Sequence, residues 1–125
     1  MALVGATIRR PISSAFDLGT GCGVQALHAS THSSRVVASD LNPRASACAT
    51  LTMEINDVAN VEVREGNLFD PVEGEHFDLV VSHIMLHETS RQAIPQIFKE
   101  SRRLLSPGGK MIHADLPDIR KIQIG

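Results

Sequence analysis

Short apolar runs, and one run of alternating apolar and polar residues at 61–65, predict five β-strands, most of them separated by stretches of helical periodicity. The predicted strands cover residues 15–18, 35–39, 61–65, 77–82 and 110–114. Apolar residues at helical spacing predict helices from residue 24 to about 30, from 43 to about 56, and from about 90 to 105. Strands that alternate with helices indicate an α/β fold with a mainly parallel sheet and right-handed crossovers.

Capping and turn residues mark where the helices begin and end. Asn42 followed by Pro43 is a strong start signal for the second helix. Pro95 either kinks the third helix or starts its main segment. The run 106–109, Ser-Pro-Gly-Gly, is expected to stop that helix before the fifth strand. Between the third and fourth strands a helix is weak or absent, and residues 121–124 could form a short strand.

Three alternating glycines, Gly19, Gly21 and Gly23, follow the first strand directly and precede the first helix. A residue without Cβ can take a positive φ and let a ligand lie against the backbone. A dinucleotide fingerprint, G-x-G-x-x-G, would place its third small residue at position 24, which is Val24 here. The pattern therefore favours a nucleoside-binding loop of another kind, with an ordinary strand-to-helix turn as the alternative.

Polar residues follow two neighbouring predicted strands. Asp40 ends the second strand, where a carboxylate can accept both hydroxyls of a ribose; its alternative role is that of an acid at a helix N-terminus. Asn67 follows the third strand and could hydrogen-bond an adenine edge, or could simply suit a turn. Since ligands in parallel sheets bind beyond the carboxyl ends of the strands, these groups and the glycine loop are expected to meet at one rim.

Composition limits the function classes. A chain of 125 residues is one domain at most, and 42% hydrophobic residues suffice for a core. A net charge of −2 gives no reason to expect broad attraction to nucleic acid or to membranes. Cys22 and Cys48 lack metal-ligand spacing, so we expect two free thiols, no metal site and a cytoplasmic protein.

Taken in order, these segments resemble class I S-adenosylmethionine-dependent methyltransferases. The matching segments are 17–23 (DLGTGCG), Asp40, 66–69 (GNLF), 77–82 (FDLVVS) and 105–110 (LSPGGK). The resemblance implies a Rossmann-like three-layer sandwich with strand order 3-2-1-4-5, whose methyltransferase domain covers residues 15–115. Residues 1–14 would be a lead-in segment and 116–125 a C-terminal tail.

The same resemblance implies a role for each matching residue in holding S-adenosyl-L-methionine. The three glycines would pack against the amino-acid end of the cofactor, Asp17 would help to hold its amino group, and Asp40 would take the ribose. Asn67 and the backbone of Leu68 would take the adenine, and Ser82 would lie near the methionine portion. The full expected set is Asp17, Gly19, Thr20, Gly21, Cys22, Gly23, Asp40, Leu41, Asn67, Leu68 and Ser82.

The methyl acceptor is harder to infer. Methyltransferases acting on glutamine side chains or bases carry an Asn-Pro-Pro-aromatic motif after strand four, where this chain has 82–85 (SHIM). The stretch 86–88 (LHE) is similar to small-molecule methyltransferases, which favours a small-molecule acceptor at O or N. His87 and His83 are the candidate general bases, with Glu88 beside them; each histidine could instead serve packing or cofactor contact.

Three other possibilities stay open. The family's further helix and antiparallel hairpin are missing or rudimentary, so the fifth strand is expected to be an exposed edge that could pair with a second copy. The chain could thus be a truncated methyltransferase, or a catalytically silent cofactor-binding or assembly module. An NAD-dependent oxidoreductase is the rival enzyme class, against which Val24 argues.

Overall fold

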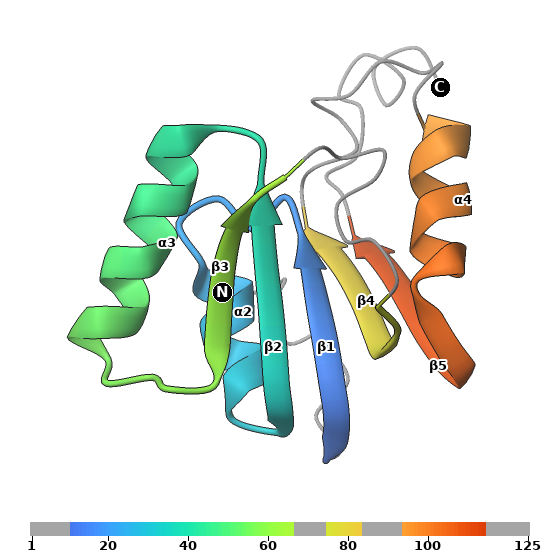
Figure 1. The fold of residues 1–125 in the computed structure, drawn as a ribbon, viewed down its shortest axis with the longest axis horizontal. Helices are drawn as coiled ribbons and strands as arrows, with labels where there is room; N and C mark the ends of the chain where they lie inside the picture. Colours follow the sequence, from blue (N-terminus) through green and yellow to red (C-terminus); the bar gives the residue numbers. More distant parts are fainter. Residues whose placement is uncertain (1–10, 67–74, 84–93, 115–125) are drawn as a thin grey trace, which may run out of the picture.

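The sheet of this chain is parallel throughout and has five strands in the order β3-β2-β1-β4-β5 (Figure 1). The computed structural model describes residues 11–66, 75–83 and 94–114. The strands are β1 (Ile12–Leu18), β2 (Ser33–Asp40), β3 (Val61–Glu65), β4 (Phe77–His83) and β5 (Leu105–Ala114). The helices are α2 (Val24–Ser30), α3 (Pro43–Ile55) and α4 (Ile94–Arg103). The predicted Rossmann-like order 3-2-1-4-5 is confirmed.

The first two strands begin earlier than their apolar runs predict. Ile12 pairs with Ser33, and the Ile12 amide donates to the carbonyl of His32 at 2.9 Å. The polar residues at these strand starts are therefore held by the ladder itself, not by burial of an apolar side chain. A hydrophobic pattern cannot detect such residues.

The expected turn at 106–109 lies inside β5, which corrects the prediction for this segment. The ladder between β4 and β5 is irregular between Phe77 and Leu79, and this irregularity absorbs the extra residues on β5. Gly108 has a φ of +79°, and a Cβ on Gly109 would lie 2.9 Å from the carbonyl oxygen of Ser106. The glycines thus permit a bulged strand where their composition suggested a stop.

Two helix starts follow the predicted chemistry. The Asn42 side chain accepts a hydrogen bond from the Arg44 amide at 2.9 Å, and Pro43 is the first residue of α3. Pro95 is the second residue of α4, so it stands at the described start of that helix, where its missing N–H is tolerated.

Alternation along the strands buries the two faces of the sheet against different helices. Ala15 of β1 packs in a core with Ala26 of α2 and Met53 of α3. Phe16, its neighbour, packs on the other face with Ile97 of α4. Figure 1 shows α2 and α3 on the β1–β3 side and α4 beside β4 and β5. The three layers of the predicted sandwich follow from this division.

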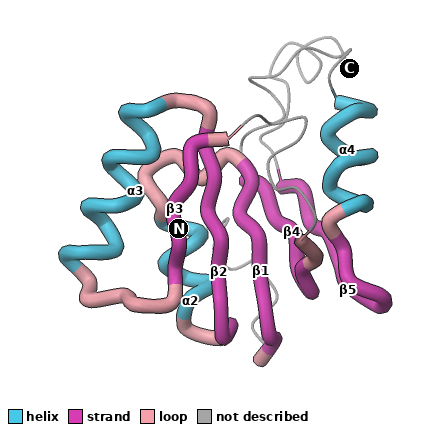
Figure 2. Tube along the Cα trace, in the orientation of Figure 1, coloured by secondary structure: helices cyan, strands magenta, loops and turns pink. Residues whose placement is uncertain are grey.

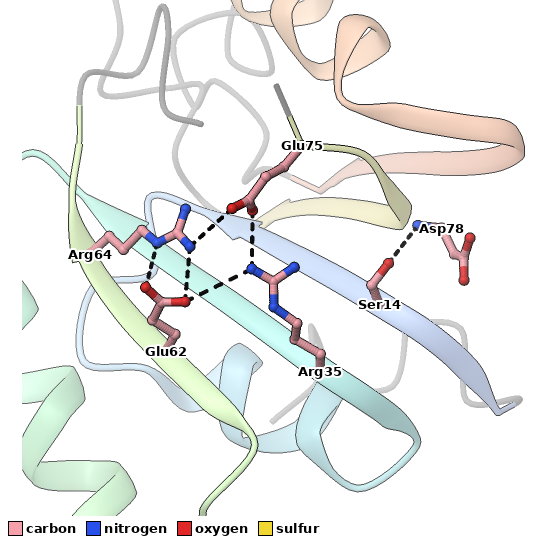
Figure 3. Close-up of polar contacts among 6 residues, drawn as sticks. All are labelled: Ser14, Arg35, Glu62, Arg64, Glu75 and Asp78. Atoms are coloured by element: carbon pink, nitrogen blue, oxygen red, sulfur yellow. Dashed lines mark hydrogen bonds and ion pairs between the residues drawn. The ribbon is translucent and has the colours of Figure 1, made fainter. Parts of the chain in front are cut away.

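A charged cluster covers β2 and β3 on the same face of the sheet as α4 (Figure 3). None of the described helices packs over this part of the face, since α4 lies beside β4 and β5 (Figure 1). Arg64 donates to Glu62 at 2.7 Å and to Glu75 at 3.2 Å, and Arg35 donates to Glu75 at 3.1 Å. The Arg35 guanidinium also lies 5.6 Å from the ring centroid of Phe77. The hydrogen bond from Arg64 holds the pKa of Glu62 below its usual value. The cluster lets the polar side of two strands face water.

Several predicted features fall outside the described residues: the weak helix between the third and fourth strands, most of the 66–71 turn and the strand at 121–124. Of the described helices, the longest, α3, has 13 residues, and none combines the length and apolar character of a membrane span.

Candidate functional site

The glycine loop after β1 has the backbone that its sequence predicts. Gly19, Gly21 and Gly23 have φ values of +70°, +59° and +86°, all in the left-handed region that disfavours a side chain. A Cβ on Gly21 would meet nothing within 4 Å, whereas one on Gly23 would lie 3.0 Å from Met53 Cε. Gly23 is therefore required by packing against α3, while Gly21 borders open space that a ligand can use.

Asp40, at the end of β2, ties this loop to the next one. Its Oδ2 accepts from the Gly21 amide at 2.9 Å, and its Oδ1 accepts from the Asn42 amide at 3.0 Å. The loops after β1 and β2 thus lie together at one end of the sheet (Figure 2). A carboxylate has about four acceptor positions, so Asp40 retains acceptor capacity for the hydroxyls of a ligand.

Asp17, near the end of β1, is buried with a side chain only 1% exposed. Its Oδ2 accepts from Thr20 Oγ1 at 2.7 Å. Burial raises the pKa of Asp17 to about 7, the hydrogen bonds from Thr20 and from the Ala26 backbone oppose the rise, and the negative charge of Asp40 adds to it. A buried carboxyl beside the charge of Asp40 can hold a cationic group, which would favour the ionised form of Asp17.

Other members of the expected set flank this pair. The Thr20 amide donates to the Ser39 carbonyl at 2.9 Å, which fixes the loop over the end of β2. Cys22 is exposed, and its carbonyl accepts from Thr52 Oγ1 at 2.8 Å. Leu41 is 62% exposed beside Asp40, so its side chain is available as an apolar wall for a base.

Ser82 lies at the same rim, but its hydroxyl has a protein partner. It is fully buried near the end of β4, and its Oγ lies 2.6 Å from Nδ1 of His113 on β5. His113, which lies 31 positions from Ser82 in the chain, is not among the residues singled out from the sequence. The signal that was available is the position of His113 one residue before the end of the fifth predicted strand.

Four predicted site residues have no described side chain. Asn67, Leu68 and His87 lie outside the described residues, and of His83 only the backbone, the last residue of β4, is described. The neighbouring Gly66 amide donates to the Asp40 carbonyl at 3.0 Å. The end of β3 therefore reaches the same rim, one residue before Asn67.

Three surface hollows lined by described residues lie away from this rim. The groove between the end of α3 and the start of β3 has a volume of about 590 Å³ and includes Met53, Val58 and Val61 in its lining. It lies toward the amino ends of the strands, so it is not the site defined by Gly21 and Asp40. The described residues also contain no group of three or more His, Cys, Asp or Glu side chains placed to hold a metal ion.

The parallel sheet, the glycine loop after β1 and the acid at the end of β2 are typical of Rossmann-like α/β domains that bind nucleoside cofactors. Comparison with known families identifies which of these domains the chain is. The methyltransferase domain family matches residues 16–113, so the chain belongs to this family.

Among curated proteins, the chain is similar to ribosomal protein L11 methyltransferases. It is 40% identical over 105 residues to that of Pelotomaculum thermopropionicum, covering 82% of this chain and 32% of the relative. It is 32% identical over 127 residues to that of Lactobacillus helveticus, covering 97% of this chain and 38% of the relative. The chain thus spans about a third of the length of these relatives.

Solved structures share the fold. YcgJ from Bacillus subtilis superposes with a TM-score of 0.80 at 21% identity, over 91% of this chain and 48% of that one. DhpI in complex with SAH superposes with a TM-score of 0.75 at 25% identity, over 86% of this chain and 51% of that one.

Proposed function

We propose that this chain is the S-adenosylmethionine-binding domain, residues 15–115, of a methyltransferase that transfers a methyl group to a nitrogen or oxygen atom of a protein. The observation that carries the proposal is the Asp40 carboxylate bonded to the Gly21 amide at 2.9 Å, because it joins the ribose acid to the glycine loop. The family match over 16–113 and the relatives named as L11 methyltransferases support it.

The described residues fit S-adenosylmethionine in charge and in shape. The open side of Gly21 admits the backbone approach of a ligand, and the remaining acceptor positions of Asp40 suit two ribose hydroxyls. Asp17, at the base of the glycine loop, suits the cationic amino-acid end. DhpI, a 25% identical structure, was crystallised with SAH and with SAM, which supports the same ligand class here.

When bound, the sulfonium cofactor supplies an already activated methyl group, so the protein mainly has to position the two reactants. In this proposal Asp40 fixes the nucleoside, the glycine loop fixes the amino-acid end, and the ends of β4 and β5 face the acceptor. The expected Asn67 and Leu68 contacts to adenine remain part of the proposal.

A small-molecule acceptor is the second candidate. It is favoured by the 86–88 stretch (LHE), which is similar to small-molecule methyltransferases. The relatives named as L11 methyltransferases give the protein acceptor priority.

The test is release of S-adenosylhomocysteine by the chain, measured with ribosomal protein L11 and, in parallel, with a panel of small amines and alcohols. Turnover with L11 supports the protein acceptor, and turnover only with a small acceptor replaces it. Tight cofactor binding without turnover on any acceptor would contradict a catalytic role and favour a silent binding module.

A further inference from the structure

The ends of β4 and β5 bring together Ser82, which the resemblance places near the methionine portion of the cofactor, and His113, which no cofactor assignment uses. Ser82 pairs with His113 in the parallel ladder, so both side chains leave the same face of the sheet. That face is the one covered by α4, since Val80, two residues before Ser82, packs with Ile97. Ser82 Oγ and His113 Nδ1 are 2.6 Å apart, a short hydrogen bond that fixes the ring.

The pair lies at the cofactor rim. The β1–β4 register places Asp17 beside Val81, so the glycine loop begins one strand away from Ser82 and two strands away from His113. At a strand spacing of about 4.8 Å, His113 is roughly 10 Å across the sheet from the loop. This separation leaves room for the reacting end of a cofactor and an acceptor group between them.

The other ring nitrogen of His113 has no hydrogen-bond partner in the described part of the chain. This atom, Nε2, is buried. Phe98 of α4 meets the ring edge-on, with centroids 4.8 Å apart and planes at 86°. A buried imidazole nitrogen without a partner is uncommon, and its hydrogen-bonding capacity suits a polar group that arrives with a ligand.

The protonation state suits a proton acceptor. Burial lowers the pKa of His113, and no charged group contributes to the shift. Its ring is hydrogen-bonded to the hydroxyl of Ser82 on β4 and packs edge-on against the ring of Phe98 on α4. The lowered pKa favours the neutral imidazole, and when Nδ1 carries the proton toward Ser82, the Nε2 lone pair is available to a ligand.

We propose that His113 Nε2 accepts the proton lost by the methyl acceptor and that Ser82 is the positioning residue for its ring. This inference rests on the proposed function. In the step, an acceptor nitrogen or hydroxyl transfers a proton to Nε2 and forms a bond to the methyl carbon. The electron pair of the broken carbon–sulfur bond stays on sulfur, which becomes a thioether, and His113 later releases the proton to water.

The first test compares His113→Gln with a matched control, His76→Gln, at an exposed position just before β4. Since a general base contributes typically about 10²–10⁴-fold, kcat near pH 7 is expected to fall by about 100-fold in His113→Gln. The KM for S-adenosylmethionine should stay within about twofold in both variants. The loss should shrink as pH rises, because an acceptor amine then loses its proton to water. Equal kcat in both variants at every pH would overturn the inference.

Ser82→Ala separates positioning from packing. It should lower kcat by about tenfold and change the pH profile, and Ser82→Thr, which restores a hydroxyl, should recover most of the loss. A uniform fall in stability with an unchanged pH profile would show that Ser82 serves packing alone.

A binding readout keeps the inference testable apart from turnover. The probe is an S-adenosylmethionine analogue with an amine in place of the methyl-sulfonium group, followed by nitrogen NMR of the wild-type histidines. The His113 Nε2 resonance should shift, and that of His76 should not. Binding without any change at His113 overturns the inference alone. Absence of binding by S-adenosylmethionine and the analogue overturns the proposed function and the inference with it.

Discussion

Asp17 makes the stability of this chain depend on pH in the direction opposite to most carboxylates. Its pKa is raised from 3.8 to about 7, first by burial, so the folded state holds a proton that the unfolded state releases. Between these values the folded state binds more protons than the unfolded state. The free energy of unfolding therefore falls as pH rises toward 7, and this contribution is fully present only below about pH 4.

The perturbation that isolates this effect is Asp17→Asn, which keeps an oxygen for the Thr20 hydroxyl and cannot ionise. From about pH 5 to pH 7 the Asp17 contribution spans two pKa units, or about 3 kcal/mol. The difference in unfolding free energy between Asp17→Asn and wild type should thus shift by about 3 kcal/mol in favour of the variant. Because the other titrating groups are common to both proteins, they cancel in this difference.

Urea denaturation near pH 5 and near pH 8 measures the effect. Asp57→Asn, at an exposed position with a φ of +53° that asparagine tolerates, controls for loss of one carboxylate. A difference between Asp17→Asn and wild type that stays constant within about 1 kcal/mol would refute the raised pKa and the reading of Asp17 as a buried acid.

Three further predictions concern the rim. Gly21→Ala should lower the free energy of unfolding by only about 1 kcal/mol, because of its positive φ, yet weaken cofactor binding. Gly23→Ala should lower it by about 3 kcal/mol, because its Cβ would also meet Met53 Cε at 3.0 Å. Thermal melts measure the stabilities and calorimetry the binding, and equal melting points of the two variants would contradict the packing argument. Asp40→Ala leaves two backbone amides unpaired and should cost about 1–3 kcal/mol in urea denaturation even without ligand; an unchanged midpoint would show that these bonds are weak. Asn42→Ala removes the α3 cap and should cost about 1 kcal/mol without changing cofactor affinity; a large change in affinity would mean that Asn42 itself reaches the ligand.

The strand order and the loop chemistry were predictable because they depend on local signals. Buried parallel strands are near-continuous apolar runs, and the chirality of crossovers leaves few topologies. The positive φ values at Gly21 and Gly23 follow from the spacing of the glycines and from the helix that starts there. The position of Asn42 directly before Pro43 indicates that it caps the N-terminus of α3.

What escaped prediction depends on register and on packing across the chain. The bulge near Phe77 moved the start of β5 to Leu105, and no local pattern encodes that shift. The Ser82–His113 bond depends on the same register.

The central claim is that the glycine loop and Asp40 form one nucleoside-binding rim. Calorimetric titration of wild type and of Asp40→Asn with S-adenosylhomocysteine, with NAD as the competing ligand class, tests it directly. The account predicts binding of S-adenosylhomocysteine by wild type, a Kd at least about tenfold higher in Asp40→Asn because a charged hydrogen bond is lost, and no binding of NAD. An equal Kd in both proteins, or binding of NAD alone, would contradict it.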